Sequence, residues 1–228
     1  MAKIIYKSKG AVVILKPVGI SAQPDSTSSD DALTQTSAEL RAAGENSTLY
    51  PVHRLDKVVS GLLIFARTKE YAAELSALVS GEGIGKEYFA VVEGRCSEGK
   101  MEDYLIKDAA LGKAKISKKD AAGAKLAILE AEPLACVAGE HGEHTLVKIK
   151  LQTGRFHQIR AQLSARGCPI VGDKKYGAKG YLSRTPALFS YRLEIPLKNE
   201  KISARALPEL SEYPWNLFDS VLYGVDEK

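Results

Sequence analysis

Short apolar runs alternate with polar, turn-forming segments along the 228-residue chain, and the spacing within each run predicts its conformation. Continuous or alternating apolar positions predict strands at residues 3–7, 11–15, 62–66, 88–92, 125–134, 144–151, 187–197 and 201–205, the last two paired with each other. Apolar positions three and four residues apart predict helices at residues 30–41, 68–78 and 156–166, with a short one at 215–222. Ser28, Ser29 or Asp30 is expected to cap the first helix and Thr68 the second. Helices mixed with several consecutive strands favour an α+β fold over a doubly wound sheet.

No internal repeat, low-complexity linker or domain boundary interrupts this pattern, so residues 1–228 are expected to form a single domain. Hydrophobic residues make up 45% of the chain and charged residues 26%, which is typical of a soluble globular protein with a sizeable core. The first nine residues hold three lysines and no long apolar run, which excludes a signal peptide. No apolar run elsewhere approaches the length that crosses a membrane.

Cysteine and histidine spacing gives no sign of a disulfide framework or a metal site. Cys96, Cys136 and Cys168 lie far apart and are odd in number, so reduced thiols in a cytoplasmic protein are expected. His141 and His144 have the spacing of a metal pair, but no acidic or cysteine partner stands at ligand spacing. Solvated histidines near a polar loop at residues 140–143 are the favoured interpretation, and no metal is expected.

Positive charge is concentrated in the second half of the chain. Residues 1–110 carry 13 Lys and Arg against 15 Asp and Glu, and the remainder carries 19 against 13, within a net charge of +4. The basic residues cluster at 113–125 and 148–184. Such clusters indicate a polyanionic partner, RNA or DNA first, although a solvated lysine-rich face explains them equally well.

Two stretches carry candidate chemistry. In the first, His-Arg-Leu-Asp-Lys-Val-Val-Ser-Gly at residues 53–61 leads into the apolar run 62–66, which places Asp56 on a loop at the mouth of a buried strand. A turn capped by Arg54 and Asp56 would account for that stretch alone. In the second, Leu-Gln-Thr-Gly-Arg-Phe-His-Gln-Ile-Arg at residues 151–160 places Arg155 near a helix N-terminus, where anions are favoured. Gln158 and Arg160 are expected to donate further hydrogen bonds there; an ordinary capped helix with a surface arginine is the alternative.

Taken together, the two stretches resemble the RluA-type pseudouridine synthases, enzymes that isomerise uridine to pseudouridine in structured RNA. Gly-Cys-Pro-Ile-Val-Gly-Asp-Lys-Lys-Tyr-Gly at residues 167–177 continues the resemblance. Lesser matches follow in the expected order: the Lys-Pro-x-Gly turn after the strand at residues 13–15, the Lys-x-Tyr strand at residues 86–94, and the late strand at residues 188–196. The resemblance covers about residues 11–200.

The resemblance implies a role for each of four residues. Asp56 aligns with the catalytic aspartate, and Arg54 with the arginine that helps to flip the target base and hold its place. Tyr88 aligns with the tyrosine that stacks on the uracil, and Arg155 with the basic residue that pairs with the aspartate. The sequence departs from the family at other positions, namely Val59 before Ser-Gly, Phe156 after Thr-Gly-Arg and Phe189 in the late strand.

The residue types suit this chemistry. Breaking a glycosidic bond, turning the uracil and rejoining it through carbon needs a nucleophile or a stabilising anion near the sugar, and a carboxylate serves either purpose. An adjacent arginine favours the ionised carboxylate, and a flipped uridine needs an aromatic ring to stack on. No redox, metal or phosphate-transfer step is required, so no cofactor is expected.

The resemblance also implies a mixed, mostly antiparallel sheet with flanking helices and a catalytic cleft. We expect a monomeric, cytoplasmic enzyme whose partner is a stem-loop of ribosomal or transfer RNA, with no DNA and no membrane. Because the Lys-Pro turn comes at Lys16, no N-terminal S4-like domain is expected, and the basic face must supply the RNA affinity. A non-catalytic RNA-binding protein that keeps the fold is the alternative, disfavoured because all four residues are present. An Asp-dependent hydrolase is disfavoured by the absence of a metal set.

Overall fold

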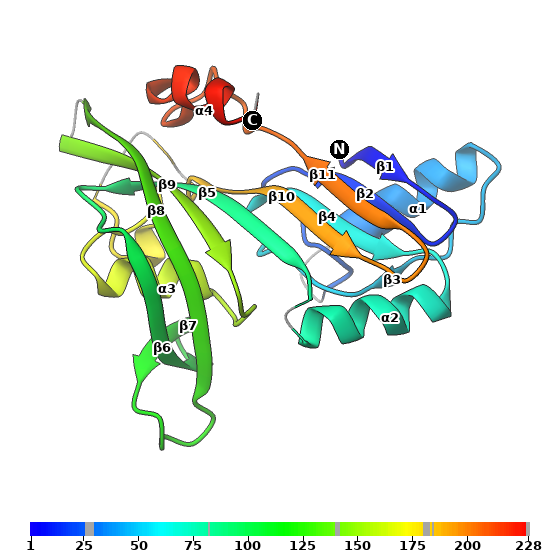
Figure 1. Ribbon diagram of the computed structural model, residues 1–228, viewed down its shortest axis with the longest axis horizontal. Coiled ribbons are helices and arrows are strands. Elements are labelled where there is room, and N and C mark those ends of the chain that lie inside the picture. Colours follow the sequence, from blue (N-terminus) through cyan, green and yellow to red (C-terminus); the bar gives the residue numbers. More distant parts are fainter. Residues whose placement is uncertain (26–29, 82, 140–141, 180–182, 184, 227–228) are drawn as a thin grey trace. The chain divides into compact units, whose positions relative to one another are not determined.

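The computed structural model describes residues 1–25, 30–81, 83–139, 142–179, 183 and 185–226. The chain forms two compact units (Figure 1). Unit 1 comprises Met1–Lys86 and Phe189–Pro208, and unit 2 comprises Glu87–Leu188 and Glu209–Lys228. The chain therefore passes from one unit to the other three times. The single-domain expectation stays a prediction.

Unit 1 is a small sheet with two helices. Its elements are β1 (Lys3–Lys7), β2 (Ala11–Lys16), α1 (Ala32–Ala42), β3 (Tyr50–Pro51), β4 (Ser60–Ala66), α2 (Lys69–Ser80), β10 (Leu188–Pro196) and β11 (Lys201–Arg205). The strands follow the order β1-β2-β4-β10-β11, and β3 also pairs with β4. β10 runs parallel to β4, and the other pairs described here are antiparallel.

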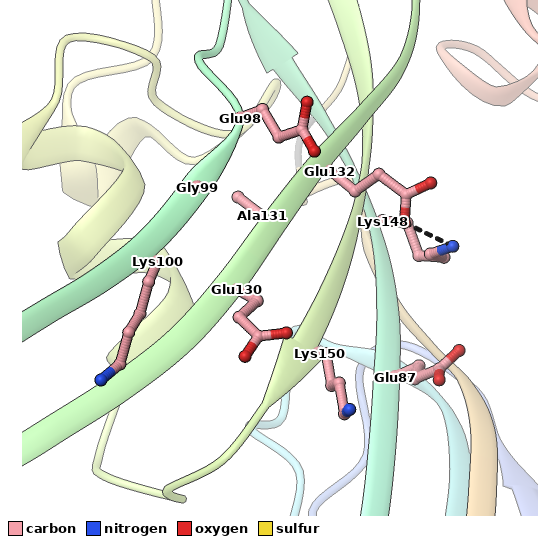
Figure 2. Close-up of a pocket in the computed structure, with 9 residues that line it drawn as sticks. All are labelled: Glu87, Glu98, Gly99, Lys100, Glu130, Ala131, Glu132, Lys148 and Lys150. Atoms are coloured by element: carbon pink, nitrogen blue, oxygen red, sulfur yellow. Dashed lines mark ion pairs between the residues drawn. The ribbon is translucent and has the colours of Figure 1, made fainter.

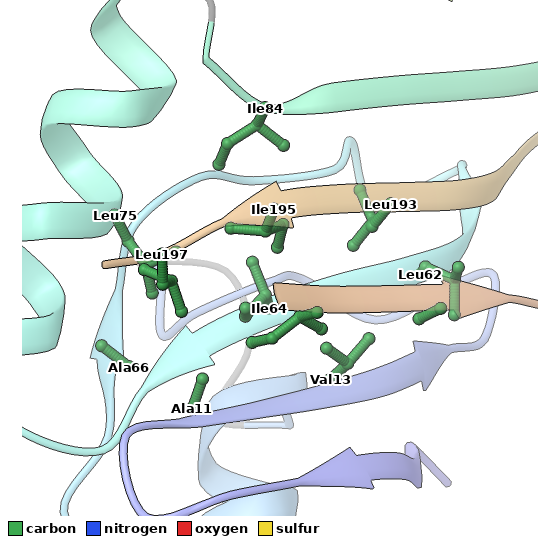
Figure 3. Close-up of a cluster of buried hydrophobic side chains, with 12 residues drawn as sticks. Ala11, Val13, Leu62, Ile64, Ala66, Leu75, Ile84, Leu193, Ile195 and Leu197 are labelled. Atoms are coloured by element: carbon green, nitrogen blue, oxygen red, sulfur yellow. The ribbon is translucent and has the colours of Figure 1, made fainter. Parts of the chain in front are cut away.

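The core of unit 1 forms where alternate strand residues meet α2 (Figure 3). Thr68 caps α2 as predicted, because its hydroxyl accepts a hydrogen bond from the backbone N–H of Tyr71. Leu75 on this helix is completely buried with residues of β2, β4, β10 and β11. Residues 11–14 and 62–66 are completely buried at every position, so β2 and β4 are covered on both faces, as their continuous apolar runs indicate.

The cap of α1 differs from the prediction. Asp31 caps the helix, because its Oδ1 accepts from the Thr34 backbone N–H at 2.9 Å and its Oδ2 from the Thr34 hydroxyl at 2.7 Å. The predicted cap Asp30 is thus displaced by its neighbour. Ser28 and Ser29, the other two candidates, lie outside the described residues.

Unit 2 is a larger sheet on which one helix packs. Its elements are β5 (Gly85–Glu93), β6 (Gly99–Asp108), β7 (Lys113–Ser117), β8 (Lys125–Gly139), β9 (Gly142–Leu151), α3 (Gln158–Ala165), α4 (Asp219–Asp226) and the 3-10 turns η1 (Lys174–Tyr176) and η2 (Trp215–Leu217). The strand order is β5-β9-β8-β6-β7, and α3 contacts β6 and β7. A small buried cluster of Leu105, Ala114, Ala127, Ala161 and Tyr176 joins sheet and helix.

These elements confirm the predicted α+β class and the mostly antiparallel sheet. α3 begins at Gln158 and not at Phe156, because His157 adopts a left-handed conformation with φ 51° that a helix cannot include. β9 already begins at Gly142, where a loop was predicted; residues 140 and 141 of that loop lie outside the described residues. At the chain's end, Trp215 is buried in a 3-10 turn and the helix follows it.

Candidate active site

Asp56 lies in unit 1 on the loop between β3 and β4, where it is partly buried, while Arg54 is exposed. The loop turns on itself, because the Val59 N–H donates to the Asp56 carbonyl at 3.0 Å. It is also tied to the turn after β2, because the Gly19 N–H donates to the Lys57 carbonyl at 2.8 Å. The candidate carboxylate therefore stands on a loop that backbone hydrogen bonds fix on both sides.

A histidine anchors the same loop to the sheet. β4 pairs with β10 at Ser60 and Gly61 and with β3 at Phe65 and Ala66. Between these two contacts, the Ile64 N–H donates to His53 Nε2 at 3.3 Å. Burial of the imidazole, together with the charge of Lys86, lowers the pKa of His53 to about 3. The ring is thus neutral and acts as a scaffold for the loop.

Lys16 is the functional candidate in unit 1 that the sequence interpretation did not single out. Its side chain is completely buried at the end of β2, and its Nζ donates to the carbonyls of Pro17 at 2.9 Å and Ile20 at 3.0 Å. Burial lowers the pKa of Lys16 to about 8, and the charge of Asp56 opposes that shift. A buried cation therefore lies within electrostatic reach of the candidate carboxylate in unit 1. The sequence held a signal for it, because Lys16 shares a strand face with the buried Val12 and Ile14.

Tyr88 and Arg155 lie in unit 2. Tyr88 is buried on β5, and its ring is on the sheet face opposite to that of its neighbour Glu87, because strand residues alternate. Arg155 is exposed between β9 and α3. Its Nε donates to the Leu126 carbonyl at 2.8 Å, and its backbone N–H donates to Gln158 Oε1 at 3.0 Å. The four predicted site residues thus divide two and two between the units, and the pairing of Arg155 with Asp56 stays a prediction.

Two other polar residues of the Thr-Gly-Arg stretch donate hydrogen bonds, as predicted, and their acceptors lie inside the fold. Arg160 is buried and forms a bidentate ion pair with Asp173, with Nε–Oδ2 2.6 Å and Nη2–Oδ1 2.8 Å. Gln158 donates from Nε2 to the Ile128 carbonyl at 3.0 Å and accepts from the Thr153 hydroxyl at 2.8 Å. Gln158 thus braces the turn around Arg155 from inside the fold, and Arg160 ties α3 to Asp173 just before η1.

Cations and aromatic rings gather beside Arg155 in what we name the Phe156 cluster, which consists of Lys107, Lys113, Phe156, His157 and Tyr176. The rings of Phe156 and His157 stack with centroids 3.8 Å apart, and His157 Nδ1 lies 2.9 Å from the Tyr176 hydroxyl. Lys107 Nζ lies 4.9 Å from the centroid of the Phe156 ring, and Lys113 Nζ lies 5.9 Å from that of Tyr176. The cluster thus combines fixed rings with positive charge on the α3 side of β6 and β7.

The opposite sheet face of unit 2 carries a hollow of about 460 Å³ (Figure 2). Its charged side chains alternate in sign across the strands, and Lys148 pairs with Glu132 at 2.5 Å. The lining residues are Glu87, Glu98, Gly99, Lys100, Glu130, Ala131, Glu132, Lys148 and Lys150. None of the four predicted site residues is among them, so the hollow is separate from the candidate site.

The described part of the chain places no group of three or more His, Cys, Asp or Glu side chains where they could share a metal ion. His144 is buried; its Nδ1 lies 3.0 Å from the Gly142 carbonyl and its Nε2 3.0 Å from the Tyr213 hydroxyl. His141 lies outside the described residues.

Among the helices of the described residues, none has the length and apolar character needed to cross a membrane.

Comparison with known proteins gives one consistent result. The family model described as RNA pseudouridylate synthase matches residues 10–165. Ribosomal large subunit pseudouridine synthase D of Borreliella burgdorferi is 31% identical over an alignment of 236 residues, gaps included, which covers 98% of this chain and 69% of the relative. tRNA pseudouridine synthase C of Vibrio vulnificus is 30% identical over 187 residues, which cover 78% of this chain and 74% of the relative. The human structure named RNA Pseudouridylate Synthase Domain Containing 4 shares the fold, with a TM-score of 0.75 at 22% identity over 91% of this chain and 89% of that one.

Proposed function

The chain belongs to the RNA pseudouridylate synthase family, and from this premise we propose that Asp56 is the aspartate that starts the isomerisation of uridine to pseudouridine. The reaction breaks the bond between the uracil nitrogen and the sugar, turns the base and rejoins it through carbon. A carboxylate suits the first step either as a nucleophile or as a stabilising anion.

The setting of Asp56 carries this proposal. A reacting carboxylate must be held in place, and the loop around Asp56 is fixed through the carbonyls of Asp56 and Lys57. It also lies within electrostatic reach of the completely buried Lys16, whose pKa is lowered by burial and raised by the charge of Asp56. The other interpretation of residues 53–61 is an exposed turn capped by Arg54 and Asp56. That interpretation does not explain why Lys16 is completely buried.

The other three residues take the roles that the family resemblance gives them. Arg54, exposed two residues before Asp56, assists base flipping. Tyr88 offers its ring to the uracil. Arg155 pairs with the aspartate; its guanidinium has five N–H donors, of which Nε serves the Leu126 carbonyl.

The substrate that we propose is a stem-loop of ribosomal or transfer RNA, the two substrate classes that the names of the relatives contain. The Phe156 cluster supports an RNA partner over DNA duplex, because stacked rings among lysines suit unpaired bases and phosphates together. We further propose that the enzyme acts as a monomer in the cytoplasm, where free thiols such as those of Cys96, Cys136 and Cys168 persist.

The proposal is tested with RNA tritiated at uridine C5, because rejoining through that carbon releases the label. The wild type is expected to release tritium from cellular ribosomal or transfer RNA, and Asp56→Asn to release none above background. Asp219→Asn, which neutralises an exposed carboxylate at the start of α4, serves as the matched control and should behave as wild type. Undiminished release by Asp56→Asn would refute the role of Asp56, and no release by the wild type from any cellular RNA would refute the substrate class.

A further inference from the structure

The turn that carries Arg155 contains a residue in a strained backbone conformation. The Gln158 N–H donates to the Arg155 carbonyl at 3.1 Å, and the Arg155 N–H donates to Gln158 Oε1 at 3.0 Å, so residues 155–158 form a closed turn. His157, the third residue of this turn, has a φ of 51° and a ψ of 26°. Among the residues that the structure describes, His157 is the only one other than glycine with a positive φ. Because left-handed backbone costs free energy at a residue with a Cβ, other contacts must hold His157 in this conformation.

The hydroxyl of Tyr176 supplies such a contact. It lies 2.9 Å from His157 Nδ1, and it accepts a hydrogen bond from the Ala114 N–H at 2.7 Å. Tyr176 is buried in η1 and Ala114 is buried in β7. The His157 ring is also stacked on the Phe156 ring. A single hydroxyl group therefore joins the turn before α3 to two other segments of unit 2.

These contacts favour one arrangement of protons. A phenol hydroxyl has one proton, and its oxygen can accept hydrogen bonds while it donates that proton. Because the Ala114 N–H donates to the oxygen, the Tyr176 proton is available for His157 Nδ1 when this nitrogen carries no proton. That tautomer of the neutral imidazole has its proton on Nε2. A protonated imidazole would instead bring a second N–H group to the same oxygen, and the hydroxyl proton would have to turn away from His157.

The charged groups around this hydrogen bond favour a neutral imidazole as well. Lys107 from β6 and Lys113 from β7 lie over the rings of the cluster, and the guanidinium carbon of Arg160 from α3 lies 5.0 Å from the centroid of the tyrosine ring. The carboxylate of Asp173 already pairs with Arg160. A proton on the imidazole would therefore add a fourth positive charge to this group of side chains.

We propose that His157 and Tyr176 are positioning residues for the isomerisation. The Tyr176 hydroxyl donates to Nδ1 of the neutral His157, holds the left-handed turn and thereby sets the direction of Arg155. Protonation of His157 breaks this hydrogen bond and releases the turn, so the positioning of Arg155 is lost in acid. The inference rests on the role proposed for Arg155 and names two residues that act through it.

Tritium-release rates of the full-length protein at saturating RNA test the proposal, because kcat is then separated from RNA affinity. The wild-type kcat is expected to fall as the pH drops from about 7.5 to about 5.5, the range in which an imidazole ordinarily takes up a proton. At the upper end of this range, Tyr176→Phe and His157→Ala should each lower kcat about tenfold. The double variant should lose no more than either single variant, because both substitutions remove the same hydrogen bond.

The conservative variant His157→Asn separates positioning from a merely structural role. Asparagine tolerates left-handed backbone, and its side-chain oxygen can accept the hydrogen bond that Nδ1 accepts, but it does not titrate. His157→Asn should therefore recover part of the kcat that His157→Ala loses, and its kcat should show no fall in acid. A second histidine–tyrosine pair of unit 2 provides the matched control. Tyr213→Phe removes a hydroxyl that lies 3.0 Å from His144 Nε2, and its kcat should keep the wild-type value and pH dependence.

Long-range proton–nitrogen NMR of the imidazoles locates the proton directly, with His157→Asn identifying the signals of His157. At neutral pH, Nδ1 should carry no proton. The proposal is overturned by a proton on Nδ1, by an unchanged kcat in Tyr176→Phe, by an equal loss in Tyr213→Phe, or by an acid fall that the wild type lacks or His157→Asn keeps. The NMR spectrum and the wild-type pH profile decide even if Tyr176→Phe fails to fold. A failure of the proposed function is distinguishable, because the wild type would then release no tritium at any pH.

Discussion

Gly61 leaves the space through which the backbone of Ser190 passes. A Cβ atom at position 61 would lie 2.5 Å from the Ser190 nitrogen and 2.8 Å from its Cα, and Gly61 has a φ of +116°, which favours glycine. The contact sets β10 beside the start of β4, directly after the loop that carries Asp56. The Ser-Gly pair of the first stretch is thus a packing requirement of the candidate site and not merely a turn signal.

Gly61→Ala should therefore destabilise the protein strongly. We expect a loss of about 3 kcal/mol or more in the free energy of unfolding, from backbone strain and steric overlap together. Gly44→Ala is the matched control, because Gly44 also has a positive φ, +72°, but no atom lies within 4 Å of its added Cβ; it should cost only about 1 kcal/mol. Urea denaturation of both variants measures the difference, and equal losses would show that the contact with Ser190 contributes nothing.

Removing the buried cation of Lys16, which interacts electrostatically with Asp56, should slow the reaction. Lys16→Met is expected to lower kcat about tenfold, equivalent to about 1.4 kcal/mol of transition-state stabilisation. Because the pKa of Lys16 is about 8, the wild-type kcat should fall as the pH rises through 8 and the ammonium loses its proton. Lys16→Arg keeps its charge and should lose that alkaline fall. Tritium-release rates measured between pH 6 and 9.5 test this prediction. If kcat of Lys16→Arg still falls above pH 8, a group other than Lys16 causes the fall.

Stability should decrease in acid because of His53. The folded pKa of about 3 lies below the ordinary value of about 6.5 in the unfolded chain, so between these values only the unfolded chain takes up a proton. The contribution of His53 to the free energy of unfolding is therefore complete above pH 6.5 and is lost as the pH falls toward 3. Between pH 7 and 5 the loss is about 2 kcal/mol. His53→Gln retains an acceptor for the Ile64 N–H but does not titrate, and its urea midpoint should vary less over this range. An identical pH dependence in both proteins would contradict the assignment.

The Phe156 cluster should contribute to RNA affinity. Lys107→Gln is expected to weaken binding and to reduce the slope of log affinity against log salt by about one, because one phosphate contact is lost. Lys100→Gln is the matched control on the same strand, since Lys100 lines the hollow on the other sheet face. Titrations of a labelled stem-loop at several salt concentrations compare them. If both variants lose the same slope, the cluster has no special part in binding.

The two units should unfold together. The chain joins them at three places, after Lys86, Leu188 and Pro208, so neither unit can unravel without disturbing strands or termini of the other. Trp215, the single tryptophan, reports on unit 2; Tyr50→Trp combined with Trp215→Phe places the probe in unit 1. Coincident urea curves from the two proteins are expected. Two separate transitions would show that the single-domain expectation is wrong.

Features that depend on neighbouring residues were predictable from the sequence. β2 and β4 follow from continuous apolar runs, and α2 follows from its spacing and from Thr68. The strand, turn and helix pattern likewise placed Asp56 on a loop before a strand and Arg155 near a helix N-terminus, where the structure has them.

Features that depend on distant partners were not predictable. Arg160 is buried because Asp173 meets it in the folded chain, and α3 starts late because His157 turns toward Tyr176. Lys16 is the exception, because it shares a strand face with the buried Val12 and Ile14, which indicates burial.

The threefold passage of the chain between units also bears on how such a protein can change over time. Unit 1 needs β10 and β11 from far down the chain, and unit 2 needs the segment after Pro208, so neither is a contiguous piece of the gene. Recombination that exchanges a single block of coding sequence cannot transplant one unit intact. The half that holds Asp56 and the half that holds Tyr88 and Arg155 are therefore inherited together.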